Sequence, residues 1–594
     1  MQTLTKNRVR KRQADGLTVA NLQALLVTIR TRPDYRMPAS EEMDAQVQQA
    51  GQMNTYQKSV LLLLPIVVVG CAIKAQDSQH ISGKPGASDG PAKTDSLPAR
   101  QDGDAKAGRE VFRFETFGNE GFWTDAVRMP AGIKAAKVTP LQALQLGLSV
   151  DVDALDTAMK VLLTEQLKAD PTGKTSAMLN DPSATGKLIN ANSVIGMVIK
   201  DSNRDGVLDA DHGDKVGVSC ALCHTITDGS VFSMPNGGSI GHRQDGLTNH
   251  NLNVGKILAT GANSRALYPN LQLSLKANKG KTFGRAPQGL TETSTEAEVD
   301  AYLSNPKYYP VGMFDDTFDG NGNPVHISHL FRQDLAAPFA SEGSIARLDN
   351  FSNFVYTILF DETNLTTPGG RAFLHKLGGA AGDEIADNYV KILAETGVTG
   401  YPFVRADKHP NPGSEEAPIG VRVDNNKLLD LNAYEVSLQA PAGAKVNSKA
   451  ANRGRQMFTS TAGCTACHNV DQGKPVPNFI VPMKQIFPGD NPTILAQRDA
   501  PLNPVQDTPG ITFDDKQMVV NASLRGGIRG ITLPLLLDLA RKPVFLHDDS
   551  VRGLDSLLNP SRGASAPHPF YVANSKDRKD MIEFLSSLDT TSAK

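Results

Sequence analysis

The sequence predicts a mostly α-helical protein that contains two related modules and long irregular insertions. Three observations lead to this prediction. The unit Cys-x-x-Cys-His occurs twice, at 220–224 and 464–468. A Gly-x-x-x-Phe segment precedes each unit, at 108–112 and 454–458. The chain also has 52 glycines and 36 prolines, which favour turns and loops between the helices.

The two Cys-x-x-Cys-His units predict two covalently bound haem c groups. In this attachment pattern the two thiols add to the porphyrin vinyl groups, and the adjacent histidine binds the iron. A zinc site built from both cysteine pairs is the alternative, but zinc does not require a histidine directly after each pair. The fold class is therefore expected to be two cytochrome c-type haem modules. The residues expected to hold the haems are Cys220, Cys223 and His224, and Cys464, Cys467 and His468.

An apolar run that ends in a cysteine predicts a lipoprotein signal peptide at 53–71. The run is too short for a transmembrane helix of about 20 residues, but it suits the core of an export signal. Lipid on Cys71 would anchor an exported protein, periplasm-facing or on the cell surface, and Ala72 after it favours the outer membrane. The basic stretch 1–52 does not resemble an export signal and is expected not to be translated. The alternative is a genuine extension with a membrane-anchoring helix at 59–71.

Composition suggests how the mature chain is organised. Residues 72–106 are rich in small and charged residues and predict a flexible tether. The N-terminal haem module, with a large insertion, is expected at 107–439, and the C-terminal cytochrome c module at 440–594. A net charge of −2 and a pI near 6.6 give no electrostatic reason to expect nucleic acid as a partner.

Internal repeats support two related modules. In the C-terminal half the haem unit follows the Gly-x-x-x-Phe segment closely, whereas in the N-terminal half a long interval separates them. That interval includes apolar residues at helical spacing, for example at 155–167. Downstream of each haem unit, the segment 338–349 parallels 543–555. The amphipathic stretch 575–588 is expected to form a terminal helix that crosses the helix of Gly454.

Together with the haem units, the segment 542–554 (Lys-Pro-Val-Phe-Leu-His-Asp-Asp-Ser-Val-x-x-Leu) resembles the bacterial di-haem cytochrome c peroxidase superfamily, including its larger rubber-oxygenase-like members. The usual family segment has glycine where this chain has Asp549. The resemblance covers about 107–594, with specific motifs only at the haem units and their downstream repeats. It implies one haem with an open or labile sixth position, which meets peroxide or oxygen. It also implies a six-coordinate haem that relays electrons from a redox partner protein.

The sixth ligand of the C-terminal haem is expected to be a histidine. Simple peroxidases place a methionine after the His-Asp-Gly segment, but Ser561 occupies that place here. His568 lies further along and offers a nitrogen, so ligation by His468 and His568 is predicted. Met483 and Met518 are the alternatives. Replacing methionine by histidine should lower the reduction potential.

The N-terminal haem has no unique sixth ligand in the sequence, and His242, His250, His326 and His329 all remain candidates. The repeat places Glu342 where the C-terminal copy has Asp548, so Glu342 is a candidate for moving the peroxide proton. Its alternative role is a helix cap or a surface carboxylate. Trp123 is the only tryptophan and is expected to pack in the core or to act as an electron stepping stone.

A calcium loop is predicted just before the first haem unit. Asp201, Asn203, Asp205, Val207 and Asp209, with a glycine at the sixth place, follow the spacing of such loops, and His212 replaces the usual glutamate. An acidic turn without an ion is the alternative. Asp315, Asp316, Asp319 and Asn321 form a second cluster of oxygen ligands.

Two classes of function fit these features. The first is an oxidoreductase that uses peroxide or oxygen at the N-terminal haem and relays electrons through the C-terminal haem. The second is a non-enzymatic di-haem electron carrier in which both irons are six-coordinate. Because both classes need the same haems, axial ligation is the property that separates them.

Overall fold

The computed structural model describes residues 103–590, except 283, 337–338, 341–344, 346, 467, 469, 471–479, 483–529, 533, 547–548, 565 and 567; for 480–482 and 530–532 it describes the backbone only. All the described residues belong to one compact unit. The predicted extension at 1–52, the signal with Cys71 and nearly all of the tether lie outside the described residues. Within the described part no helix is long and apolar enough to span a membrane.

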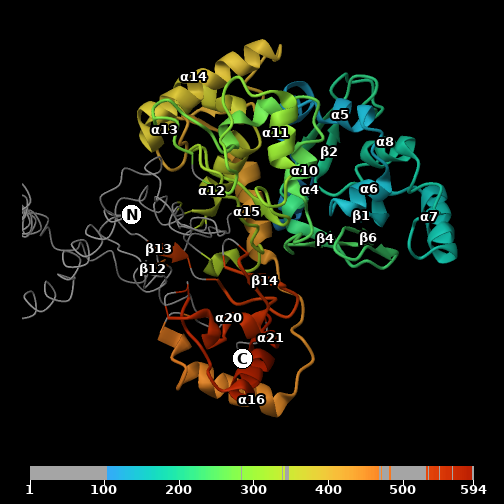
Figure 1. The fold of residues 1–594 in the computed structure, drawn as a ribbon. Coiled ribbons are helices and arrows are strands. Elements are labelled where there is room, and N and C mark those ends of the chain that lie inside the picture. The colour runs from blue at the N-terminus through green and yellow to red at the C-terminus, as the bar shows by residue number, and fades with distance from the viewer. Residues whose placement is uncertain are drawn as a thin grey trace, which may run out of the picture. The chain divides into compact units, whose positions relative to one another are not determined.

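Helices predominate and the sheets are small, which confirms the mostly α prediction (Figure 1). One sheet has three strands in the order β1-β6-β5, and the other described sheets have two strands each. The strands are β1 (Val150–Asp151), β2 (Met197–Lys200), β3 (Lys215–Val218), β4 (Thr225–Thr227), β5 (Phe232–Ser233), β6 (Ser239–Gly241), β7 (Arg243–Asp245), β8 (Met313–Phe314), β9 (Val325–His326), β10 (Asp407–Lys408), β11 (Val421–Arg422), β12 (Ile480–Pro482), β13 (Gly530–Thr532), β14 (Val544–Phe545) and β15 (Val551–Arg552).

The first helix of the described part crosses a helix that lies more than three hundred residues later in the chain. Helix α4 (Ala105–Phe114) begins at the end of the predicted tether, where the Asp104 carboxylate accepts the Lys106 N–H. It packs against α15 (Asn425–Ser437). At the crossing, a Cβ on Gly108 would lie 1.9 Å from the Asp430 carbonyl oxygen, so only glycine permits this approach. Phe112 packs edge-to-face on Tyr434, with ring centroids 5.5 Å apart at 64°.

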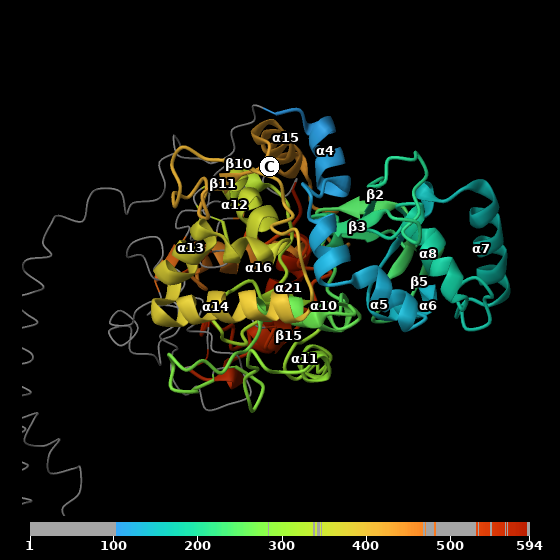
Figure 2. The same ribbon diagram turned by 90° about the horizontal axis from the view of Figure 1, so that it is seen from above.

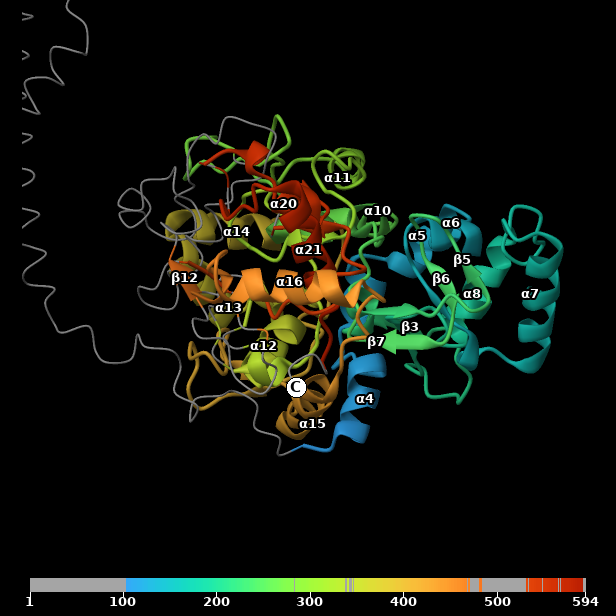
Figure 3. The ribbon, with the colours of Figure 1, turned by 90° about the horizontal axis from the view of Figure 1, so that it is seen from below.

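The C-terminal part repeats the same crossing. Helix α16 (Ser448–Thr459) packs against the terminal helix α21 (Ser575–Ser586), and Figure 3 shows the pair from below. A Cβ on Gly454 would lie 2.1 Å from the Asp580 carbonyl oxygen. Phe458 and Phe584 make the matching ring contact at 5.4 Å and 63°. Both crossings therefore set Gly-x-x-x-Phe against Asp-x-x-x-aromatic, which confirms that the final helix crosses the Gly454 helix.

The second sequence repeat also folds alike in both halves. Phe339 pairs with Ile345 in an antiparallel bridge, and Phe545 pairs with Val551 between β14 and β15. The residue after each phenylalanine has a left-handed backbone, with φ of 65° at Ala340 and 69° at Leu546. A helix then begins at the matching leucine in each copy, α12 (Leu348–Phe354) and α20 (Leu554–Leu557).

The long interval before the first Cys-x-x-Cys-His unit forms a group of short helices around small strands, seen on one side in Figure 2. The prediction of a helix near 155–167 is confirmed by α7 (Thr157–Ala169). The other helices here are α5 (Met129–Ala135), α6 (Pro140–Gln145) and α8 (Pro182–Asn190). Further along the chain lie α9 (Ala221–His224), α10 (Val254–Leu258), α11 (Glu296–Leu303), α13 (Pro368–Gly378) and α14 (Ala380–Glu395).

Candidate functional site

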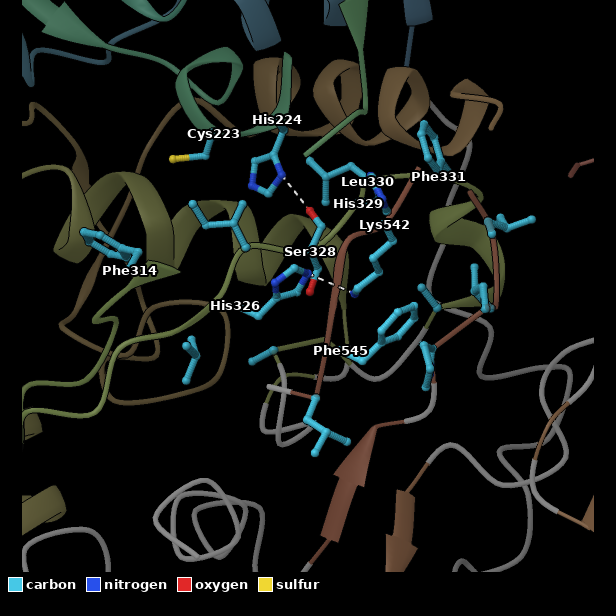
Figure 4. Close-up of a pocket in the computed structure, with 18 of the residues that line it drawn as sticks. Cys223, His224, Phe314, His326, Ser328, His329, Leu330, Phe331, Lys542 and Phe545 are labelled. Atoms are coloured by element: carbon cyan, nitrogen blue, oxygen red, sulfur yellow. Dashed lines mark hydrogen bonds between the residues drawn. The ribbon is translucent and has the colours of Figure 1, made fainter. Parts of the chain in front are cut away.

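One cavity joins the two Cys-x-x-Cys-His units. Its volume is about 650 Å³, and mostly apolar side chains line it. Pockets of about 300–1,000 Å³ with apolar walls are typical of cofactor sites. Figure 4 shows part of it, where Lys542 and Phe545 of the C-terminal part lie near His326 and His224 of the N-terminal part. The residues of the two units that line it are Cys220, Cys223 and His224, and Cys464 and His468, together with His568.

The first unit lies at the end of β3, where the chain turns into the short helix α9. The Asn119 side chain bonds the backbone of Val218, and the Ser219 hydroxyl donates to the Arg113 carbonyl, so the unit is held by the helix α4 region. The Cys220 sulfur lies 3.4 Å from the Tyr356 hydroxyl. Burial raises the pKa of both thiols, Cys220 and Cys223, to about 12.

His224 is arranged as a metal ligand. Its Nδ1–H donates to the Ser328 carbonyl oxygen over 2.9 Å, which leaves Nε2 free to bind a metal (Figure 4). Histidine ligands in metal sites commonly donate their second nitrogen in this way, because it fixes the ring and its tautomer. Burial lowers the pKa of His224 to about 4, so the imidazole is neutral and can coordinate iron.

His468 and His568 fit two ligands on opposite sides of one iron. Their ring centroids are 6.2 Å apart. A metal–imidazole bond is about 2 Å long and each nitrogen is about 1 Å from its ring centroid, so trans ligation sets the centroids about 6 Å apart. Burial lowers the pKa of each ring to about 4. The chemistry and spacing of this pair suit a six-coordinate haem.

Three of the four candidate sixth ligands of the first unit gather on one side of it. His250 stacks on His326 at 5.3 Å and meets His329 edge-on at 5.5 Å. Because Ser328, between the latter two, accepts the Nδ1–H of His224, the cluster lies on the Nδ1 side of that ring rather than on the Nε2 side. The fourth candidate, His242, is exposed and pairs with Asp153 at 2.8 Å.

The C-terminal part reaches this histidine cluster directly. The Lys542 Nζ donates to Nε2 of His326 over 2.9 Å, and the Asp549 carboxylate lies 2.8 Å from its Nδ1. Because an ammonium group can only donate, Nε2 of His326 acts as the acceptor, and the Asp549 carboxylate lies at ion-pair distance from Nδ1. Asp549 has φ of 55°, a left-handed backbone conformation that glycine adopts more easily than aspartate. Aspartate is therefore less favourable than glycine for the backbone here, but it supplies a carboxylate that pairs with His326.

Two further residues lie in the cavity wall. Glu435 on α15 is 4% exposed, its Oε2 has no hydrogen-bond partner within the described part of the chain, and burial raises its pKa to about 8. Nothing in the sequence around Glu435 distinguishes it from a surface glutamate on a helix, so its place in the cavity wall could not be predicted. Trp123 is 8% exposed and packs edge-to-face on Phe122, which confirms the expected packing role.

Several predicted site residues lie outside the described residues: Glu342, Cys467, Met483 and Met518. The loop at 201–209 is described and exposed. There Asp201 and Asp205 accept backbone N–H groups of Asp205, Gly206 and Val207, and Asp209 bonds His212. Calcium at this loop stays a prediction. Among the described residues no group of three or more His, Cys, Asp or Glu is placed to hold a metal ion.

No family model and no curated protein matches the chain. Among solved structures, a chain of Kuenenia stuttgartiensis hydrazine synthase aligns over 46% of this chain and 75% of its own length. The identity is 14% and the TM-score is 0.21, so this likeness carries no argument about fold or function.

Proposed function

We propose that the protein is an exported di-haem c-type cytochrome that acts as a peroxidase-like oxidoreductase and relays electrons between two haems. The observation that carries the proposal is the single apolar cavity that reaches Cys220, His224, Cys464, His468 and His568. The duplicated helix crossing supports two modules of one kind, because Gly108 and Gly454 serve the same close approach.

Each haem supplies one-electron redox chemistry and, where a coordination position is open, a place for peroxide or oxygen to bind. In the C-terminal part, His468 and His568 would both hold the haem iron, so this site would carry electrons without binding an oxidant. Burial keeps both rings neutral, and a neutral imidazole is the form that binds iron, which suits an electron-relay role.

In the N-terminal part, His224 would bind on one side only. The Ser328 carbonyl fixes its ring, and the nearby histidines lie on the Nδ1 side. The opposite side would be open to peroxide or oxygen. Glu435 is a buried carboxyl in the wall of this cavity that holds a proton near neutral pH, so it is a candidate to deliver that proton to a bound oxidant.

An electron carrier is the second candidate, and one observation favours it. Met129 and Met197 line the cavity beside the first unit, and a thioether from either would fill the open position. In both cases a redox partner protein would supply or accept electrons. Lipid on Cys71 would hold the protein at a membrane, with the outer membrane favoured.

Electron paramagnetic resonance of the oxidised holoprotein tests the proposal. We expect one low-spin and one high-spin haem, with the high-spin signal changing when peroxide is added. His568→Asn should convert the low-spin haem to high-spin; asparagine suits the left-handed backbone at this position, where φ is 54°. His242→Asn, at an exposed histidine, is the control and should leave both signals unchanged.

Each alternative outcome has a distinct meaning. Two low-spin haems in every redox state would contradict the enzyme and support the carrier. A low-spin signal that survives His568→Asn would show that another residue binds the C-terminal iron.

A further inference from the structure

The turn between β8 and β9 buries a set of oxygen atoms. It comprises residues 315–323, and the exposed fractions of Asp315, Asp319 and Asn323 are 0%, 1% and 5%. Carboxylates are rarely buried this fully unless they are paired or coordinate a metal. Among the described residues no lysine or arginine pairs with Asp315; its carboxylate accepts the backbone N–H groups of Thr317 and Asn323 and contacts the Thr317 hydroxyl.

Three acceptor oxygens converge on the hydroxyl of Thr317. Its Oγ1 lies 2.9 Å from Oδ1 of Asp315, 3.2 Å from Oδ1 of Asp319 and 2.9 Å from Oδ1 of Asn323. The Thr317 hydroxyl has one proton, so it can donate a hydrogen bond to only one of the three oxygens. In the other two contacts, two oxygen atoms lie close together with no hydrogen between them. Calcium with ligands at about 2.3–2.6 Å in a pentagonal bipyramid sets neighbouring oxygens about 2.8–3.4 Å apart. The three separations measured from Thr317 Oγ1 all fall in this range.

Other buried polar groups beside the turn lack hydrogen-bond partners within the described residues. The Tyr302 hydroxyl, on a residue 5% exposed, would lie 2.8 Å from a Cβ at Gly322, so it is directed at the turn. Glu362 is 1% exposed with a free Oε2, and its charge interacts with that of Asp315. The Tyr302 and Glu362 oxygens are observations, separate from the loop itself, that point to a cation here.

The residue order agrees with the geometry. Asp315, Thr317, Asp319, Asn321 and Asn323 occupy places 1, 3, 5, 7 and 9 of a calcium loop. Gly320 occupies place 6 and has φ of 78°, as the sharp turn of such a loop requires. The proposed ligands include only two carboxylates, and the others are amide and hydroxyl oxygens. The site therefore agrees with the finding that no group of three or more His, Cys, Asp or Glu among the described residues is placed to hold a metal ion.

The loop at 201–209 has the same spacing, with φ of 82° at Gly206, and both loops have a histidine at place 12. The two differ in burial. The 201–209 loop is exposed, so water can solvate its carboxylates and they need no ion. The 315–323 turn is enclosed, and burial and mutual repulsion raise the pKa of Asp315.

We propose that residues 315–323 bind one Ca²⁺ through the side-chain oxygens of Asp315, Thr317, Asp319 and Asn323. All four are hard oxygen donors, and protein oxygens rather than waters dominate the site, which favours Ca²⁺ over Mg²⁺. The ion would brace the β8–β9 hairpin. That hairpin leads directly to His326 and to Ser328, the acceptor of the His224 N–H, so bound calcium would help to fix the proximal ring.

Calcium binding by the full-length holoprotein tests this site. After chelation and buffer exchange, equilibrium dialysis against micromolar Ca²⁺ should show bound ion, and Ca²⁺ should raise the melting temperature. Asp315→Asn with Asp319→Asn should remove that ion and the thermal shift. The matched control, Asp201→Asn with Asp205→Asn, should retain both.

Asn323→Asp tests the same site even if the double variant fails to fold, because it adds a negative charge to the proposed ligands and should strengthen binding. We expect it to bind Ca²⁺ several-fold more tightly and to melt lower than wild type without the ion. The proposal would be overturned if the wild-type protein bound no Ca²⁺. It would also be overturned if the 201/205 variant lost the bound ion and the 315/319 variant kept it. Haem content and spin state are measured separately, so this result is independent of the proposed function.

Discussion

Gly454→Ala should destabilise the C-terminal part by about 2 kcal/mol. The added Cβ would lie 2.1 Å from the Asp580 carbonyl oxygen and 2.8 Å from the Phe584 Cβ, so α16 and α21 must move apart. Overpacking of this kind costs about 1–3 kcal/mol. Loosening the Phe458–Phe584 pair costs about 0.5–1.5 kcal/mol more. Alanine returns about 1 kcal/mol through its higher helix propensity, which leaves the net loss stated.

Gly186→Ala is the matched control. Gly186 lies in helix α8, and a Cβ there would meet nothing within 4 Å. This change should therefore stabilise its helix by up to about 1 kcal/mol. Urea unfolding of both variants, with hydrogen exchange of α16 and α21 to locate the weakened part, measures the difference. If Gly454→Ala stabilises the protein as Gly186→Ala does, the close crossing of α16 and α21 is refuted.

Two further variants test the cavity wall and the contact between the two halves. Glu435 has its folded pKa raised to about 8 from about 4.5, so its contribution to stability is complete at low pH and is lost as the pH rises through 8. Between about pH 5 and pH 9, wild type should lose a few kcal/mol of unfolding free energy relative to Glu435→Gln, as measured by urea unfolding; equal pH dependence of the two would contradict the buried carboxyl. Asp549→Asn should cost about 2 kcal/mol, because it removes the buried carboxylate 2.8 Å from Nδ1 of His326 and keeps a side chain that tolerates positive φ. Thermal melting measures it, and an unchanged melting temperature would show that this pair does not join the two halves.

Much of the local design could be predicted from the sequence. The crossing of α16 and α21 was predictable from the Gly-x-x-x-Phe segment at 454–458 and the amphipathic stretch 575–588, whereas the partner of the Gly108 helix was not. The repeat at 338–349 and 543–555 predicted two related segments, and the structure adds that each makes a β pairing followed by a helix. The predicted haem attachment and the ligation by His468 and His568 stay predictions, although the ring spacing fits them.

Features that depend on contacts between distant segments were not predictable. Glu435 looks like any glutamate on an amphipathic helix until α15 sets it in the cavity wall. His250, His326 and His329 are separate candidates in the sequence, and only the fold shows that they form one cluster on the Nδ1 side of His224. The three acceptor oxygens around the Thr317 hydroxyl likewise come together only when the β8–β9 turn is folded.

Intact mass spectrometry of the full chain, matured in a host that attaches haem c, tests the central claim most directly. The protein should be heavier than its processed polypeptide by two haems, and replacing Cys220 and Cys223 by alanine should remove one of them. A mass equal to the bare polypeptide, with pigment lost after denaturation and acid–acetone washing, would contradict a di-haem protein.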